Sequence, residues 1–473
     1  MKIAIVGGGA AGRFASLMLA RAGHDVTLFE RDRLELAPDV ESAAASAFRP
    51  TAPQIMQPHI VMARCRELLR QRLPDIYNDL LAAGVVEAPI RTQMLPSLTD
   101  TAAQPGDERL TLLQTRRSTV DWVLLRAVLA EPRIRPRSRV RVIGLTAAPG
   151  QPLHVTGVRT REGNVPADLV IDSTGRRSPI DSWLTEIGAA TTATWRAECG
   201  VAYYSRHYRL RPTRLPPGLP TMRLVAGLDE FTVGIWPADN GAMQMAVAPL
   251  AADRRFRPLK HPDVFTAVLR TVPTHAAWLD VMDPISDVFP MAGLHNTLRR
   301  LVAGGEPVVT GLHAIGDSVC TTNPTLGRGL SLAISGAADL LDTISGHADD
   351  LAEQALALDA LVGAHVAPFY HDQAAIDQAR LMALRHTIFG APAPDPLPVT
   401  HDRITYAQLR AAAAVDPTAF RAFWKVMGMM CPPEEVYTDS RVVARTLEIL
   451  KQRGDRPPIV QPSHEQLLDA LAS

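Results

Sequence analysis

The first thirty residues constrain the fold of this chain more than any other segment. Residues 2–6 are a mostly apolar run, typical of a parallel strand that is buried on both faces. A G-x-G-x-x-G pattern follows the run directly, and a helix is expected over residues 11–22. A second strand, expected over residues 25–29, ends in Glu30. A strand, a glycine-rich turn and a helix in this order predict a βαβ unit that binds a dinucleotide.

Each residue of the turn has a physical task in this prediction. Gly7 permits the tight turn, and Gly9 lets the backbone approach a pyrophosphate. Gly12 lets the helix pack close to the strand. The helix begins around Ala10 and Ala11, where free N–H groups would point at the phosphates.

The acidic residue after the second strand narrows the choice of dinucleotide. The carboxylate of Glu30 is placed to accept a hydrogen bond from a ribose 2′-hydroxyl, and it would repel a 2′-phosphate. FAD or NAD is therefore favoured over NADP, although the basic residues Arg31 and Arg33 follow closely.

Two later segments favour FAD over NAD. Residues 167–175 are a strand-like run that ends in Ser173, Thr174 and Gly175. Residues 310–317 are a second such run that ends in Gly316 and Asp317, and a loop and a small-residue helix over 329–344 follow it. An NAD dehydrogenase needs no such third segment. The final carboxylate is suited to the hydroxyls of a ribityl chain, and a helix N-terminus would offer positive dipole to a reduced flavin ring.

These three segments resemble the FAD-dependent monooxygenase superfamily of aromatic hydroxylases and squalene-epoxidase-like flavoproteins, over about residues 1–345. Residues 114–122 resemble the start of a flavin-domain helix in that family, which would place Arg117 near the pyrophosphate or ribityl chain; a solvated arginine is the alternative. The segment from Arg49 to Gln54, with His59 after it, resembles the epoxidase-like branch more loosely. Together the motifs and the resemblance assign the cofactor contacts to Gly7, Gly9, Ala10, Ala11, Gly12, Glu30, Arg31, Arg117, Thr174, Gly175, Gly316, Asp317, Pro324, Gly327, Arg328, Gly329 and Leu330.

The resemblance implies an α/β fold with three parts. A discontinuous, Rossmann-like FAD-binding domain is expected over residues 1–75, 105–180 and 285–345. A β-sheet substrate domain is expected over 76–104 and 181–284, where strand-like runs cover 194–207, 222–229, 231–236 and 242–248. Residues 346–473 are expected to form a helical C-terminal region.

The resemblance also implies a reaction. In this family reduced flavin and molecular oxygen form a C4a-hydroperoxide, which epoxidises or hydroxylates a small organic substrate, often in secondary metabolism. Electrons would come from NAD(P)H, either directly or through a separate flavin reductase. An FAD-dependent reductase or dehydrogenase acting on carbon–carbon bonds is an alternative, and so are a flavin-dependent halogenase and a flavoprotein that binds without turnover.

Few catalytic residues are expected, because the cofactor carries the chemistry. His59, at the start of an amphipathic helix expected over residues 59–73, is a candidate proton shuttle. Trp236 is a candidate substrate contact. A structural role for His59 and core packing for Trp236 are the favoured alternatives, so the catalytic residues stay unknown at this point.

Composition and residue spacing argue against a nucleic-acid-binding protein, a metalloprotein and a membrane-spanning protein. The chain has 473 residues, formal net charge zero and no basic block, so a nucleic-acid-binding role is not expected. The cysteines and histidines have no metal-ligand spacing, so no metal is expected. No apolar run is long enough to span a membrane, and a cytoplasmic monomer or homodimer is the default expectation.

Overall fold

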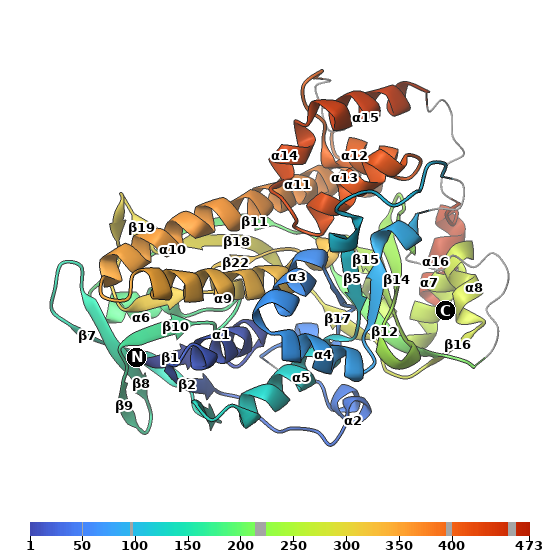
Figure 1. Ribbon diagram of the computed structural model, residues 1–473. Coiled ribbons are helices and arrows are strands. Elements are labelled where there is room, and N and C mark those ends of the chain that lie inside the picture. The colour runs from blue at the N-terminus through green and yellow to red at the C-terminus, as the bar shows by residue number, and fades with distance from the viewer. Residues whose placement is uncertain (50, 95–97, 213–223, 394–399, 453–459) are drawn as a thin grey trace.

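The computed structural model describes the whole chain except residues 50, 95–97, 213–223, 394–399 and 453–459. Five strands form a wholly parallel sheet in the order β21-β10-β1-β2-β6 (Figure 1). In chain order they are β1 (Lys2–Val6), β2 (Asp25–Glu30), β6 (Ile134–Ser138), β10 (Leu169–Asp172) and β21 (Leu312–Ala314).

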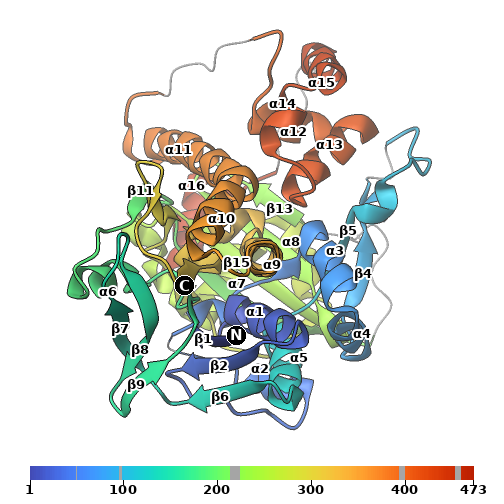
Figure 2. The same ribbon diagram turned by 60° about the vertical axis from the view of Figure 1, so that its left-hand side comes forward.

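Both faces of this sheet are buried, which explains the apolar run at the N-terminus. Ile3 and Ile5 pack on one side, where α1 (Ala10–Arg21), α5 (Arg117–Ala130) and α9 (Gly329–Gly346) lie. Ala4 and Val6 pack on the other side, against a three-stranded meander that is visible beside the parallel sheet in Figure 2. The meander consists of β7 (Val142–Ala148), β8 (His154–Thr160) and β9 (Gly163–Pro166).

A second, mainly antiparallel sheet has six strands in the order β13-β14-β15-β12-β16, with β17 also paired to β12. The strands are β12 (Tyr203–Leu210), β13 (Leu224–Gly227), β14 (Phe231–Pro237), β15 (Ala242–Pro249), β16 (Met282–Pro284) and β17 (Phe289–Met291). Alternate residues such as Val233, Met245 and Val247 pack against α7 (Pro262–Arg270), α8 (Pro273–Leu279) and the C-terminal α16 (His464–Ala472).

The opposite face of the six-stranded sheet joins the parallel-sheet body. Ser205 donates a hydrogen bond to Gln57 Oε1 over 2.6 Å, and the His59 N–H donates to Gln244 Oε1 over 3.0 Å. The end of the segment that follows β2 therefore packs on the six-stranded sheet.

A buried ion pair also joins the start of α5 to the six-stranded sheet. Arg116, just before α5, pairs with Asp239 between β14 and β15, and their side chains are 1% and 0% exposed. Asp239 accepts hydrogen bonds from the Arg116 backbone N–H (2.5 Å), from its guanidinium (2.6 Å) and from Thr119 (2.9 Å). Arg116 also pairs with Glu41 of α2 (Val40–Ala45).

Helices dominate the C-terminal third, as expected. The long helices α10 (Leu351–His365) and α11 (Ala367–Phe389) lie over the parallel-sheet body, and four shorter helices gather at one end of α11 (Figure 1). The four are α12 (Tyr406–Ala413), α13 (Pro417–Met427), α14 (Pro433–Tyr437) and α15 (Ser440–Gln452).

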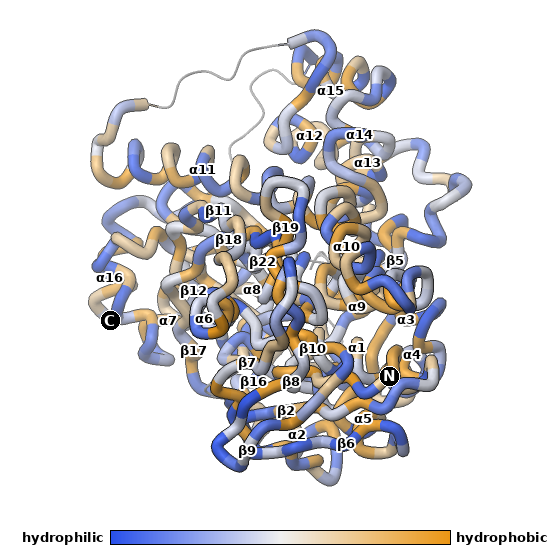
Figure 3. The backbone as a smooth tube through the Cα atoms, turned by 90° about the vertical axis from the view of Figure 1, so that its left-hand side faces the viewer, coloured by the Kyte–Doolittle hydropathy of each residue, from blue (hydrophilic) through white to orange (hydrophobic). Residues whose placement is uncertain are grey.

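Hydropathy follows burial along the chain. In Figure 3 the hydrophilic colour marks exposed tips such as the turn beside β9, whereas the interior strands and helices carry hydrophobic segments.

The remaining elements are short. β3 (Ile60–Val61), β5 (Thr111–Gln114) and β4 (Val86–Pro89) form one small sheet, and β11 (Ala193–Glu198), β18 (His295–Arg300) and β22 (Cys320–Thr321) form another. The helices α3 (Ala63–Arg72), α4 (Pro74–Ala82) and α6 (Ile180–Glu186) connect these sheets to the main body.

The structure confirms the α/β class with a Rossmann-like unit, a second sheet and a helical C-terminal region. The strand predicted over 194–207 is wrong in one respect, because a turn at Gly200, with φ of 67°, divides it into β11 and β12. The predicted domain boundaries stay a prediction; their substrate-domain ranges also contain α4, α6, α7 and α8.

Candidate flavin site

The three glycine-rich segments meet at one edge of the parallel sheet. Each follows the carboxyl end of its strand, where ligands bind in open α/β sheets. A Cβ atom on Gly12 would lie 2.0 Å from Gly7 O, and one on Gly7 would lie 2.4 Å from Ser173 O. A Cβ atom on Gly316 would lie 2.6 Å from Ala11 Cβ. Glycine is thus required at these positions for the three segments to pack against one another.

Gly9 has a different environment. A Cβ atom there would meet no protein atom within 4 Å, and Gly9 does not have positive φ. It is the N-cap of α1, whose first turn has no side-chain cap and no acidic residue. The N–H groups at the start of α1, from Ala10 to Gly12, therefore carry the uncompensated positive dipole of the helix toward open space. This arrangement suits a phosphate group.

Glu30 is held firmly at the end of β2. Its Oε2 accepts from the Gly8 N–H and from Arg49, both over 2.8 Å, and its Oε1 accepts from the Asp32 N–H over 2.8 Å. A carboxylate offers about four lone-pair positions, so Oε1 retains acceptor capacity for a ribose hydroxyl. Arg31, also assigned to the cofactor, is exposed.

A cluster of charges lies behind the start of α1. Arg117 donates to Asp121 Oδ2 over 2.9 Å, and Arg13 donates to the Asp121 main-chain oxygen over 2.6 Å. Burial opposes ionisation of Asp121, but Arg117, Arg13 and Arg49 outweigh it and lower the pKa of Asp121. The side chain of Arg117 is 11% exposed and ion-paired, so Arg117 is not a solvated arginine; its contact with the cofactor stays a prediction.

A buried carboxylate ties the second segment to the third. Asp172, at the end of β10, accepts hydrogen bonds at Oδ1 from the Thr174 hydroxyl (2.6 Å) and from Ser318 (3.2 Å). Ser318 in turn accepts from the Gly175 N–H over 3.0 Å. These bonds fix Thr174 and Gly175 against the turn that carries Gly316 and Asp317.

The carboxylate of Asp317 forms no hydrogen bond or ion pair within the part of the chain that the structure describes. Burial raises the pKa of Asp317, although Arg117 and Arg176 oppose the shift. A half-buried carboxylate in this condition needs an external donor, and the hydroxyls of a polyol supply one.

The loop after Asp317 leads into α9. Pro324 and Gly329 are exposed, Leu330 is buried, and α9 has neither a side-chain cap nor an acidic first turn. Gly327 has φ of 69°, and a Cβ atom there would lie 2.9 Å from Met62 Cε. Backbone N–H groups at the start of α9 are thus available to a ligand.

The side chain of Arg328 contacts α11 and is buried there. It is fully buried, donates to the Phe369 main-chain oxygen over 3.0 Å, and pairs with Asp372 on α11. The interpretation that its guanidinium holds the flavin is therefore not supported, because that group is already engaged. Only the backbone of Arg328 remains a candidate contact.

His59 and Trp236 both lie next to Gln244. Gln244 bonds the His59 main chain through both amide atoms, over 3.0 Å each, and it is the cross-strand partner of Trp236. The indole ring of Trp236 packs over Gly234 of the same strand, where a Cβ atom would lie 2.4 Å from the ring.

Burial lowers the pKa of His59 to about 4, so the imidazole ring of His59 is neutral at pH 7. Since its Nδ1 lies 2.9 Å from Gln57 O, Nδ1 carries the proton and Nε2 is an acceptor.

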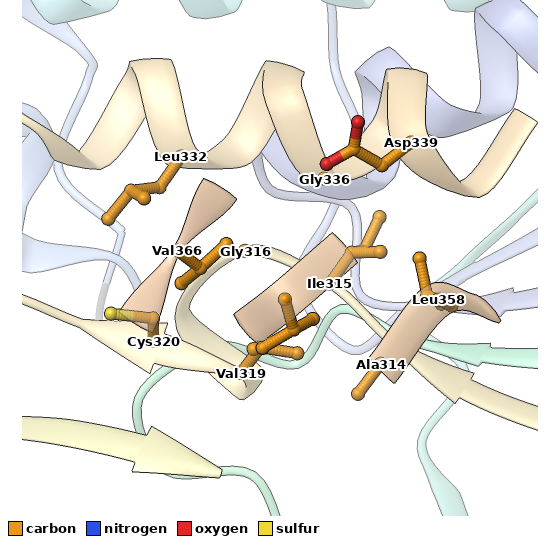
Figure 4. Close-up of a pocket in the computed structure, with 11 residues that line it drawn as sticks. Ala314, Ile315, Gly316, Val319, Cys320, Leu332, Gly336, Asp339, Leu358 and Val366 are labelled. Carbon is orange, nitrogen blue, oxygen red and sulfur yellow. The ribbon is translucent and has the colours of Figure 1, made fainter. Parts of the chain in front are cut away.

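A small cavity lies behind the third segment, between β21, α9 and α10. Its space of about 20 Å³ has room for about one water molecule, so it is not a substrate pocket. Figure 4 shows Cys320 at one end and Asp339 on α9 at the other. Cys320 is buried, and burial raises the pKa of its thiol, which favours a packing role over reactivity.

Within the described ranges, no group of three or more histidine, cysteine or acidic side chains is arranged to hold a metal ion. The helices of the same ranges include none that is long and apolar enough to cross a membrane.

Three polar residues of the site, Asp121, Asp172 and Ser318, were not predicted from the sequence. Asp121 lies four residues after Arg117, a spacing that places both on one helix face and was available as a signal. Asp172 and Ser318 act across more than 140 residues of chain, and no local pattern predicts that contact.

Comparisons with known proteins agree with this geometry. The family model of ketopantoate reductase PanE/ApbA matches residues 3–62, the segment that contains the first βαβ unit. Protein Rv3254 of Mycobacterium tuberculosis is 27% identical over 361 residues, which is 69% of each chain.

Solved structures extend the likeness to most of the fold. PqsL, a probable FAD-dependent monooxygenase from Pseudomonas aeruginosa, matches with a TM-score of 0.58 at 15% identity, over 82% of this chain and 98% of that chain. The flavin-dependent brominase Bmp2 matches with a TM-score of 0.59 at 15% identity, over 96% of this chain and all of that chain. The resemblance inferred from the three glycine-rich segments is thus confirmed at the level of the fold: this chain has the fold of the FAD-dependent monooxygenases and flavin-dependent halogenases.

Proposed function

We propose that this protein is an FAD-dependent oxidoreductase, and specifically a monooxygenase that epoxidises or hydroxylates a small organic substrate. The observation that carries the proposal is the meeting of the three glycine-rich segments around open space at Gly9. Three segments from distant parts of the chain leave their unsatisfied polar groups at one edge of the sheet, and FAD is long enough to use all of them.

The groups present fit FAD from end to end. The start of α1 would hold the pyrophosphate and Glu30 the ribose. Asp317 would hold ribityl hydroxyls, and the backbone at Pro324 and at the start of α9 would lie against the flavin ring. The molecule therefore offers one polar contact region for each polar part of the cofactor.

The protein's own share of the reaction is positioning and exclusion of water. When bound, FAD supplies the redox chemistry with oxygen that transfers one oxygen atom to a substrate. The six-stranded sheet and the segment around His59 would enclose that substrate, with Trp236 as an apolar contact. Neutral His59, with Nε2 as acceptor, would take a hydrogen bond or a proton from a substrate hydroxyl.

Two alternatives have less support. In flavin-dependent halogenases a lysine near the pocket is expected, but the four lysines of this chain, Lys2, Lys260, Lys425 and Lys451, are all exposed. A reductase acting on carbon–carbon bonds would use the same cofactor contacts, so only the product distinguishes a reductase from a monooxygenase.

NAD(P)H, bound directly or used by a separate flavin reductase, is the proposed electron donor.

Replacing Gly9 by alanine should remove FAD without unfolding the protein. The added methyl group meets no protein atom, but it occupies the space through which a phosphate would approach the backbone. We expect an FAD affinity at least about tenfold lower, measured by quenching of flavin fluorescence. Gly346→Ala is the matched control, because its methyl group also meets nothing, at the far end of α9. Equal FAD affinity in both variants would contradict the placement of the pyrophosphate.

The decisive test of the reaction uses oxygen-18 gas. Purified protein should show a flavin absorbance spectrum, and with reductant and substrate it should place one labelled oxygen atom in the product. A product without label, changed only at a carbon–carbon bond, would establish the reductase alternative. A product that forms only with chloride or bromide would establish a halogenase.

A further inference from the structure

A buried carboxylate on α11 lies at the centre of a polar cluster next to the loop that precedes α9. Asp377 is fully buried and accepts four hydrogen bonds. The donors are the side-chain amides of Asn296 (2.8 Å), Asn323 (2.8 Å) and Gln373 (3.3 Å) and the guanidinium of Arg380 (3.0 Å). Because all of these neighbours donate, the ionised carboxylate is the form that satisfies them. Burial nevertheless raises the pKa of Asp377, so the fold keeps this charge at a cost in stability.

Asn323 connects this carboxylate to the loop. It is the N-cap of the short 3-10 turn Pro324–Leu326, where its Oδ1 accepts from the Thr325 N–H over 3.3 Å. The same Oδ1 accepts from the hydroxyl of Tyr203 on β12. Asn323 is fully buried, and its amide nitrogen faces Asp377. Its side chain is therefore fixed in one orientation, with the oxygen toward the turn and the nitrogen toward α11.

The same helix also holds the middle and the end of the loop. Gln373 donates to Thr325 Oγ1 over 3.5 Å, and Asp372 pairs with Arg328. Together with Asp377 at the beginning of the loop, α11 thus supplies a contact at each of three successive positions. A loop held in this way cannot shift without breaking a buried hydrogen bond, which is expensive in free energy.

A role in stability alone does not explain the cluster. A well-packed apolar side chain usually stabilises a fold as well as a buried charge does. Asp377 instead fixes one particular loop, which contains Pro324 and leads directly into the first turn of α9. The backbone N–H groups there keep their direction only if the loop keeps its course. A misplacement of about 1 Å is enough to weaken contacts of this kind.

We propose that Asp377 is a positioning residue for the flavin: through Asn323 it sets the course of residues 323–328, and thereby the placement of the loop backbone against the flavin ring. This inference rests on the proposed function, because it takes the ring to lie against Pro324 and the start of α9. Asp377 does not itself touch the cofactor. Its effect reaches the loop through the hydrogen bond that Asn323 Nδ2 donates to Asp377 Oδ1.

The variants for the test remove this hydrogen bond and then reverse it. In Asp377→Asn an amide replaces the carboxylate among neighbours that all donate. In the double variant, Asp377→Asn with Asn323→Asp, donor and acceptor exchange places, and the loop side chain still accepts from Tyr203 and Thr325. The control is Asp253→Asn. Asp253 is also a buried acid paired with an arginine and, within the described ranges, it bonds none of residues 323–328.

Hydrogen exchange of the full-length protein freed of flavin measures the loop itself. The amides of residues 323–331 should exchange at least about tenfold faster in Asp377→Asn, the effect of one lost hydrogen bond to a charged group. The double variant should recover most of the protection, and Asp253→Asn should leave these amides unchanged. Unchanged exchange in Asp377→Asn, no recovery in the double variant, or faster exchange spread over the whole chain would overturn the proposal.

Binding of oxidised and of reduced FAD measures the consequence for the cofactor. The start of α9 favours a reduced, anionic ring, so Asp377→Asn should weaken the binding of reduced FAD about tenfold more than that of oxidised FAD. This ratio corresponds to a reduction potential about 30 mV lower. An equal loss for both forms would also overturn the proposal. Natural protein that binds no FAD would refute the proposed function, whereas the exchange measurement needs no flavin and would still decide whether Asp377 holds the loop.

Discussion

Replacing Asp239 by alanine should lower the free energy of unfolding by about 3–5 kcal/mol, the usual result of removing one member of a buried ion pair. Asp239 is fully buried and accepts hydrogen bonds from the Arg116 guanidinium and backbone N–H and from Thr119. Its removal leaves these donors buried with one partner fewer. The loss is measured by urea unfolding at pH 7, followed by tryptophan fluorescence.

Two further variants make this measurement decisive. Asp283 forms an exposed pair with Arg211 on the same sheet, so Asp283→Ala should cost less than about 1 kcal/mol. Asp239→Asn keeps the shape and some acceptors, so it should fold and lie between the two. If Asp239→Ala were no worse than Asp283→Ala, the ion pair would not hold α5 and the six-stranded sheet together.

Lowering the pH from 7 to 5 should destabilise the protein by about 2 kcal/mol for each buried histidine with a pKa near 4; His207 and His313 are two of these, and His59 is the third. Burial lowers the pKa of His207 to about 4 and that of His313 to about 4, against an ordinary value of 6.5. Between these values the unfolded chain binds more protons than the folded chain, so stability falls as the pH falls through this window. Above about pH 7 these histidines should add no pH dependence.

Unfolding curves at pH 7, 6 and 5 would test this expectation. His207→Asn and His313→Asn should each lose stability at pH 7 but show a smaller further loss at pH 5. His401→Asn, at an exposed position, should keep the slope of the natural protein. An unchanged slope in both buried variants would show that other groups cause the acid sensitivity.

Local sequence patterns predicted the parts of the site that depend on local physics. A strand buried on both faces and a turn that needs glycine are written in neighbouring residues, so the first βαβ unit and the start of α9 were predicted to within a few residues. Strand-like runs over 231–236 and 242–248 were predicted from β-type residues and correspond to β14 and β15, whereas β16 and β17 were not predicted.

The errors arose where distant segments decide the outcome. The loop position of Arg328 predicted a flavin contact, which stays a prediction, but the pairing of its guanidinium with Asp372, 44 residues later, was not foreseen. The helix predicted over residues 59–73 begins at Ala63, because Ile60 and Val61 pair with β5. Neither partner is visible in a local pattern.

The ion pair between Arg328 and Asp372 limits how this protein can be shortened or recombined. Arg328 belongs to the proposed flavin loop, whereas Asp372 belongs to α11, which leads into the last helices. A truncated chain ending near residue 346 would keep all three glycine-rich segments and still leave a buried cation without its counter-charge beside the proposed cofactor site. The segment after residue 346 is therefore a structural support of the proposed cofactor site, and grafting it from a relative would require both residues to move together.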